Sequence, residues 1–94
     1  MDETILTRHP DTAQGGVQLT KRKYNMVRDA MLHALSSNKD MTLRELTKAV
    51  DRQLWGRFNA SIPWYVKTIK LDLQARHVIE EVQVRHSRRL RLVR

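Results

Sequence analysis

The chain has 94 residues, enough for one domain with a modest core and too few for an enzyme with a separate substrate lobe. It contains 18 Lys and Arg against 10 Asp and Glu, a formal net charge of +8, and no cysteine, so disulfides, thiolate metal sites and cysteine nucleophiles are excluded. The positive charge favours a polyanionic partner, although the same excess also keeps a small protein in solution.

The expected cellular location is cytoplasmic. No apolar run of the sequence approaches the roughly 20 residues that cross a bilayer, so we expect no membrane partner. The first residues also lack the basic and apolar regions of a signal peptide, and the absence of cysteine fits a reducing compartment.

Residues 1–19 are expected to form a flexible N-terminal tail that precedes a folded domain of residues 20–94. Pro10, Gly15 and Gly16 interrupt any periodic pattern there, and polar residues fill most of the remainder. The tail has three acidic residues and one basic residue, whereas the other 75 residues hold 17 Lys or Arg against 7 Asp or Glu. The basic charge therefore belongs to the expected domain.

Two amphipathic helices are expected at the start of this domain. The first follows Thr20, and its apolar residues recur at helical spacing until polar residues end it near position 37. The second opens with the capping-box sequence Thr42-Leu43-Arg44-Glu45, in which each of the two end side chains accepts the other residue's backbone N–H. Gly56 is expected to end this helix.

The residues that flank the second helix also have expected places. Met41 and Thr42 could pair as a short first strand of a small sheet. Trp55 and Phe58 follow the helix, and we expect them in the core or stapling the helix end, because aromatic side chains are most often buried.

A third helix is expected to start at Ser61 or Ile62, because Pro63 fits the first turn, where its missing N–H costs nothing. Two opposite sides of this helix are apolar. The main stripe consists of Ile62, Val66, Ile69 and Leu73, and the second apolar side of Trp64, Leu71, Ala75 and Val78. Polar strips separate them, with Lys67, Lys70 and Gln74 in one strip and Thr68 and Asp72 in the other. A helix with two apolar sides is sandwiched or belongs to an interface.

A two-stranded hairpin is expected after this helix, because the apolar period changes to two beyond His77. The last ten residues contain five arginines and no acidic residue. Alternation predicts that Val82 and Val84 share one face of the first strand, and that in the second strand Leu90 and Leu92 face inward while Arg89 and Arg91 face outward.

The span from about Thr20 to Arg94, with three helices and then a hairpin, resembles a winged helix-turn-helix domain. Within it, the segment Trp64–Ala75 resembles part of a small bacterial family of winged-helix-like proteins with no assigned function. Many winged helices have glycine where this chain has His77, so His77 must adopt the turn conformation. The expected fold class is therefore α+β, mostly α, a winged helix with a two-stranded wing.

The resemblance implies that the third helix enters the major groove of duplex DNA and that the wing contacts the minor groove or the phosphates. Guanidinium groups suit such contacts because their N–H forks match phosphate oxygens. The candidate nucleic-acid-binding residues are Ser61, Trp64, Lys67, Thr68 and Lys70 on the helix and Arg85, Arg88, Arg89 and Arg91 on the wing.

Other interpretations of the same residues stay open. The lysines also fit an ordinary solvated helix face, and the arginines a solubilising edge. Trp64 with Leu71 also fits a homodimer interface, in which case the domain would be a protein-interaction or assembly module that reads no DNA. Trp64 and Tyr65 could instead stack on single-stranded DNA or RNA.

Catalysis is not expected. The sequence has no glycine-rich phosphate loop, no nucleophile elbow and no histidine spacing typical of a metal site, so we predict a protein that is not an enzyme and has no cofactor or metal. The hypothesis that the sequence favours is a small transcription regulator that binds double-stranded DNA.

Overall fold

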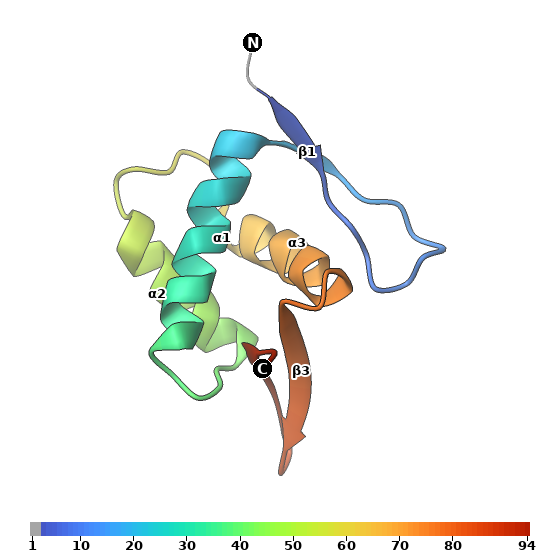
Figure 1. Cartoon of the computed structure of the whole chain (residues 1–94). Helices are drawn as coiled ribbons and strands as arrows, with labels where there is room; N and C mark the ends of the chain where they lie inside the picture. Colours follow the sequence, from blue (N-terminus) through green and yellow to red (C-terminus); the bar gives the residue numbers. More distant parts are fainter. Residues whose placement is uncertain (1–2) are drawn as a thin grey trace.

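The computed structural model describes residues 3–94, and it contains three helices, a C-terminal hairpin and a short N-terminal sheet (Figure 1). The elements are β1 (Thr4–Leu6), β2 (Gln18–Thr20), α1 (Lys21–Ser36), α2 (Leu43–Leu54), α3 (Ile62–Ala75), β3 (Ile79–Val84) and β4 (Ser87–Leu92). The predicted fold class, α+β and mostly α with three helices before a hairpin, is confirmed. Within residues 3–94, no helix is long and apolar enough to cross a bilayer.

The helices begin where the sequence predicts. At the start of α2, the Thr42 hydroxyl accepts the Glu45 N–H at 3.1 Å and the Glu45 carboxylate accepts the Thr42 N–H at 2.9 Å, so the capping box is confirmed. At the start of α3, Ser61 Oγ accepts the Trp64 N–H at 3.3 Å. Gly56 follows α2 with a φ of 74°, a left-handed conformation that glycine adopts without strain.

The core lies between the three helices and the base of the hairpin. The predicted stripe of α3 is buried along its whole length and packs with apolar residues of α1 and α2. The side chains that are at most 1% exposed include Val27, Met31, Leu46, Val50, Val66, Ile69, Leu73 and Ile79. Burial of such a shared stripe, rather than helix propensity, is what stabilises helices of 12 to 16 residues in water.

A tight turn connects α3 to β3. The carbonyl of Leu73 accepts the Val78 N–H at 2.9 Å, and the carbonyl of Gln74 accepts the His77 N–H at 3.1 Å. His77 has a φ of 61°, so it adopts the left-handed conformation that the sequence required of it. This turn determines which face of β3 is turned towards the core, because it places the side chain of Ile79, the first residue of the strand, in the core.

The register of the hairpin decides which side chains share a face. Ile79 pairs with Leu92 and Glu81 with Leu90, whereas Val82 pairs with Arg89. Since directly opposite residues lie on the same face, Leu90 faces the core with Ile79, as predicted for Leu90, and Val82 lies on the other face with Arg89. The predicted first strand at Met41 and Thr42 reduces to a single bridge between Met41 and Leu90.

The N-terminal segment differs from the prediction that ordered structure starts at Thr20. Strands β1 and β2 pair antiparallel, with Ile5 opposite Leu19, and these two side chains add to the core. The Thr7 N–H donates to the carbonyl of Val17 at 2.9 Å, and a β-carbon at Gly16 would lie 1.6 Å from the Thr7 carbonyl oxygen. The expectation that ordered structure starts at Thr20 was therefore wrong. Strands of three residues are too short for an alternating pattern to be recognised in the sequence.

A buried carboxylate connects the N-terminal segment to two helices. Asp72 is fully buried, although the sequence placed it in a polar strip of the third helix. Its oxygens accept the backbone N–H of Arg8 at 2.8 Å, the hydroxyl of Tyr24 and the Nε–H of Arg76 at 2.9 and 3.0 Å. Asp72 therefore joins the segment after β1, helix α1 and the end of α3 at one point.

This network changes the acidity of two of its members. Burial raises the pKa of Tyr24 to about 12, and the hydrogen bond to Asp72 and the negative charge of Asp72 act in the same direction. The hydrogen bond to Asp72 also raises the pKa of Arg76. Both effects favour a neutral phenol and a charged guanidinium around the carboxylate.

We expect Asp72→Ala to lower the free energy of unfolding by about 3 kcal/mol, because it leaves a buried hydroxyl and a guanidinium without their acceptor. Urea unfolding followed by circular dichroism measures this change. Asp29→Ala removes an exposed helix carboxylate and serves as the control, with an expected change within about 0.5 kcal/mol. A loss below about 1 kcal/mol for Asp72→Ala would contradict the assigned role.

The raised pKa of Tyr24 is expected to make the stability of the protein depend on pH in the alkaline range. Because its pKa is raised in the fold, its neutral phenol stabilises the protein fully below pH about 10, and this contribution is lost as the pH rises towards about 12. We expect the free-energy difference between the wild type and Tyr24→Phe to shrink over that interval. A difference that stays constant from pH 9 to about 12 would show that Tyr24 titrates normally.

Candidate nucleic-acid interface

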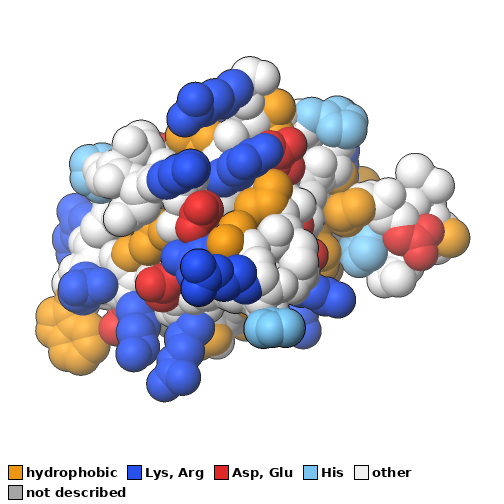
Figure 2. All heavy atoms as spheres, turned by 90° about the horizontal axis from the view of Figure 1, so that it is seen from below, with side chains coloured by type: hydrophobic (Ala, Val, Ile, Leu, Met, Phe, Trp, Pro, Cys, Tyr) orange, Lys and Arg blue, Asp and Glu red, His pale blue; other side chains and the backbone are white. Residues whose placement is uncertain are grey.

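The candidate interface lies around the end of the molecule that carries the hairpin. Figure 2 shows this end from below, with Lys and Arg side chains over much of the surface and acidic side chains between several of them. Which cations are available to a polyanion therefore depends on which of them are already paired with an acidic residue.

One group of candidates follows the side of the hairpin that lies beside α3. Lys70 Nζ is 3.5 Å from Glu81 Oε2, which places the Glu81 face of β3 alongside the helix. Gln83 pairs with Arg88, and alternation puts both on that same face. Lys67 lies one helical turn before Lys70 and is exposed.

Arg85 stands at the tip of this hairpin. Val84 pairs with Ser87, so Arg85 and His86 form a two-residue turn, and Arg85 has a φ of 56°. Its side chain is exposed. The structure therefore brings Lys67, Lys70 and Arg88 to one side of the molecule, with Arg85 at the projecting end of the same hairpin.

A second group of candidates lies on the opposite face of the hairpin and is neutralised within the chain. The Arg89 guanidinium contacts Asp40 and, at 3.1 Å, Glu45, and the hydrogen bond to Asp40 raises the pKa of Arg89. Arg91 Nε is 2.6 Å from Glu80. The structure thus does not bring these two arginines together with the lysines of α3.

The remaining candidates surround the N-terminal half of α3. Ser61 is exposed, but its hydroxyl accepts a backbone N–H of the helix. Trp64 is 45% exposed and lies edge-to-face with Tyr65 at 5.2 Å between ring centroids. Thr68 is half-buried. Trp64 is therefore the candidate of this set with the most surface for a partner.

One exposed aromatic residue was missed by sequence reasoning. Trp55 is 78% exposed, so the expectation that it lies in the core is wrong. The chain leaves α2 through a tight turn at Trp55 and the left-handed Gly56, closed by the Arg57 N–H that donates to the Leu54 carbonyl at 2.9 Å, and this turns the indole outwards. Phe58, three residues later, is the aromatic side chain that packs against the core.

The acidic side chains near the interface have structural roles. Glu81 holds Lys70, and Glu45 belongs to the capping box of α2 and contacts Arg89. The hydrogen bond from the Thr42 backbone lowers the pKa of Glu45, with smaller contributions from the Thr42 hydroxyl and the Arg89 charge. Glu45 is thus charged at neutral pH and keeps Arg89 occupied.

Comparison with known proteins places the chain in a family. Residues 4–90 match the model of a family of unknown function (DUF6958), and the chain belongs to that family. The matched span reaches from β1 into β4, so it includes the N-terminal sheet as well as the helices and most of the C-terminal hairpin. No curated protein and no solved structure matches the chain significantly.

The charge of Glu45 is expected to make the stability of the protein depend on pH in the acidic range. Its pKa is lowered from 4.5 in the fold, so its charge stabilises the protein fully above pH about 4.5 and ceases to do so as the pH falls below that value. Glu45→Gln keeps an acceptor in the capping box and removes only the charge. We expect unfolding experiments to show a difference between the wild type and this variant at pH 6 that shrinks as the pH falls below about 4.5. A difference that persists unchanged at the lower pH would contradict this role of the charge.

Proposed function

We propose that this member of DUF6958 is a winged-helix module that binds double-stranded DNA, acting as a small transcription regulator. The observation that carries the proposal is a set of uncompensated cations along one side of α3 and the hairpin. Among residues 3–94, no carboxylate lies within 4.0 Å of the charged groups of Lys67, Arg85 or Arg88. Uncompensated cations on one surface attract phosphates and release counterions when they bind.

The shape of the domain fits this use. In Figure 1 the hairpin projects from the helical body beyond the end of α3. In the proposed complex, the exposed side of α3 with Trp64 and Lys67 faces the major groove, which is about 12 Å wide and admits a helix. Arg85 and Arg88 then extend along the backbone, where guanidinium forks bind phosphates or enter a narrow minor groove.

The paired cations have a smaller part in this proposal. Arg89 and Arg91 would have to exchange a carboxylate for a phosphate, so their net contribution to affinity is reduced. Lys70 is partly buried and paired with Glu81. We therefore expect its main role to be positioning the hairpin against α3, not binding phosphate. The contacts expected to matter most are therefore Lys67, Arg85 and Arg88.

We expect Arg85→Ala combined with Arg88→Ala to weaken duplex binding and to reduce the slope of log affinity against log salt concentration by about 2, one unit for each lost phosphate contact. Fluorescence anisotropy with a labelled duplex over a salt series measures both quantities. Arg44→Ala with Lys48→Ala removes the same charge from exposed positions of α2 and serves as the control, with the slope nearly unchanged. Affinity that does not depend on salt, or equal losses in both double variants, would overturn the proposal.

A second function has specific support. The exposed Trp64 indole lies on the same side of α3 as the half-buried Leu71, about two turns away, and this side of the helix fits a protein-interaction or assembly module that pairs as a homodimer. In that case sedimentation equilibrium should show a dimer that Trp64→Ser dissociates, and duplex binding should be absent at low salt. A monomer that binds the duplex would exclude this alternative.

A further inference from the structure

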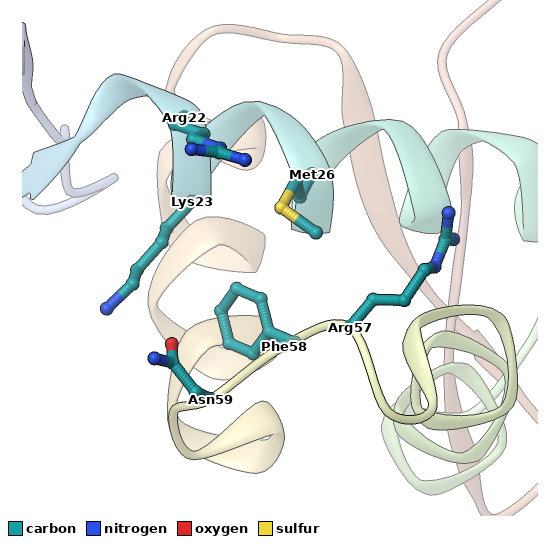
Figure 3. Close-up of a pocket in the computed structure, with 6 residues that line it drawn as sticks. All are labelled: Arg22, Lys23, Met26, Arg57, Phe58 and Asn59. Carbon is teal, nitrogen blue, oxygen red and sulfur yellow. The ribbon is translucent and has the colours of Figure 1, made fainter.

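A depression lies between the first turns of α1 and the loop that follows α2, at the end of the molecule opposite the hairpin (Figure 1). It has a volume of about 490 Å³, and its residues are not part of the candidate nucleic-acid interface. Six residues line it: Arg22, Lys23, Met26, Arg57, Phe58 and Asn59 (Figure 3). Concave sites of this size on a protein surface take up the anchoring side chain of a partner.

The floor of the depression is apolar and is held in place by the core. Met26 and Phe58 face each other in Figure 3, and both are half-buried and pack against the core. The Phe58 ring lies edge-to-face against Tyr65, with 5.1 Å between the ring centroids. Thioether and phenyl groups both make favourable contacts with an aromatic ring. The depression therefore suits one aromatic side chain of a partner.

Two cations lie on opposite sides of this floor. In Figure 3 the Lys23 side chain extends to one side of Met26 and Phe58, and the Arg57 guanidinium extends to the other. Arg57 donates an N–H to the carbonyl of Gln53 at 2.9 Å, which holds the guanidinium on its side. Because the two charged groups point away from each other, a single compact anion does not suit both. Two acidic groups that are set apart along a chain do.

The charges at the depression have no acidic partner within the chain. Among residues 3–94, no carboxylate lies within 4.0 Å of the charged groups of Arg22, Lys23 or Arg57. Arg22 and Lys23 also stand in the first turn of α1, which holds no acidic residue. The partial positive charge at a helix N-terminus disfavours cations there. Their charge therefore does not stabilise α1, and it is available to an acidic partner.

We propose that this depression docks an acidic peptide segment of a partner protein, in which one aromatic side chain has Asp or Glu on both sides. The aromatic side chain lies between Met26 and Phe58. The acidic residues before and after it reach Lys23 on one side and Arg57 on the other. The Asn59 amide both donates and accepts hydrogen bonds, so it suits the peptide backbone. This surface is separate from the proposed DNA surface and does not rest on it.

Titration of the ¹⁵N-labelled protein with three capped peptides tests the proposal. The first is Glu-Glu-Phe-Glu-Glu. The second, Glu-Glu-Ser-Glu-Glu, keeps the charge without the ring, and the third, Gln-Gln-Phe-Gln-Gln, keeps the ring without the charge. We expect the first peptide to shift the amide resonances of residues 22–26 and 57–59 with a saturable dependence, and the other two to bind at least about fivefold more weakly.

Three results of this titration would overturn the proposal. One is a control peptide that binds as tightly as Glu-Glu-Phe-Glu-Glu. Another is a set of shifts centred outside the depression. The third is the absence of saturation at millimolar peptide.

Charge reversal separates a specific site from general attraction to a basic protein. Lys23→Glu with Arg57→Glu should weaken binding of Glu-Glu-Phe-Glu-Glu about tenfold or more, and this variant should instead bind the reversed peptide Lys-Lys-Phe-Lys-Lys. Arg44→Glu with Lys48→Glu makes the same change of net charge at exposed positions of α2 and should leave binding nearly unchanged at physiological salt. Equal weakening in the two variants, or no binding of the reversed peptide, would refute the site.

Lys23→Glu alone keeps the proposal testable if the double variant fails to fold. It preserves the Arg57 contact to Gln53, and it places an acidic residue in the first turn after the Thr20 N-cap, where a helix favours one. We expect it to weaken binding of Glu-Glu-Phe-Glu-Glu about threefold or more. Unchanged binding by this folded variant would contradict the proposal.

The duplex-binding assay distinguishes this proposal from the proposed function. The Lys23→Glu and Arg57→Glu pair should bind duplex DNA as the α2 control pair does. If it loses more DNA affinity than the control and no acidic peptide binds, the depression is a phosphate contact for DNA. That result ends the peptide proposal and leaves the proposed DNA binding intact. Peptide binding by a protein that binds no duplex would support this proposal and end the other.

Discussion

The buried carboxylate of Asp72 is the interaction on which the arrangement of the chain depends. It is the point where the segment after β1, helix α1 and the end of α3 are joined by hydrogen bonds. A buried charge is tolerated only where its oxygens are satisfied, so the three elements must approach in one geometry. This geometry turns the Asp72 side of α3 inwards and leaves the side with Trp64 and Lys67 exposed.

The turn at the end of α3 fixes the orientation of the hairpin relative to that helix. Because Val78 is bonded back to Leu73 and Ile79 enters the core, the register of β3 is fixed relative to α3. The register in turn divides the arginines into two sets. Arg88 shares a face with Glu81, which holds Lys70, while Arg89 is turned towards Asp40 and the start of α2. One structural constraint therefore determines which cations are available to a partner.

Local signals in the sequence were sufficient for the three helices and for the C-terminal hairpin that follows them. The Thr42–Glu45 capping box, Pro63 in the first turn of α3 and the change of period after His77 each act within a few residues, so they are visible without tertiary structure. The burial of Asp72 could not be predicted in this way, because its partners Arg8 and Tyr24 are 64 and 48 residues distant. A charged residue in a polar strip has the same local pattern whether water or a distant segment covers it.

The site was predictable to a similar extent. Composition located the basic wing, but it could not separate Arg88 from Arg89, because pairing with Asp40 and Glu45 depends on the hairpin register. The exposure of Trp55 was missed for a related reason. The path of the chain after α2 turns the indole outwards and places Phe58 against the core, and no short pattern encodes that path.

The central claim is that α3 and the tip of the hairpin form one anion-binding surface on one side of the molecule. Chemical-shift mapping of the labelled protein with a short DNA duplex tests it most directly. The account predicts shifts at residues 64–70 and 83–88 together, and little change at Asp40 and along α2. Shifts confined to α2 or to the N-terminal sheet, or no shifts at low salt, would contradict it.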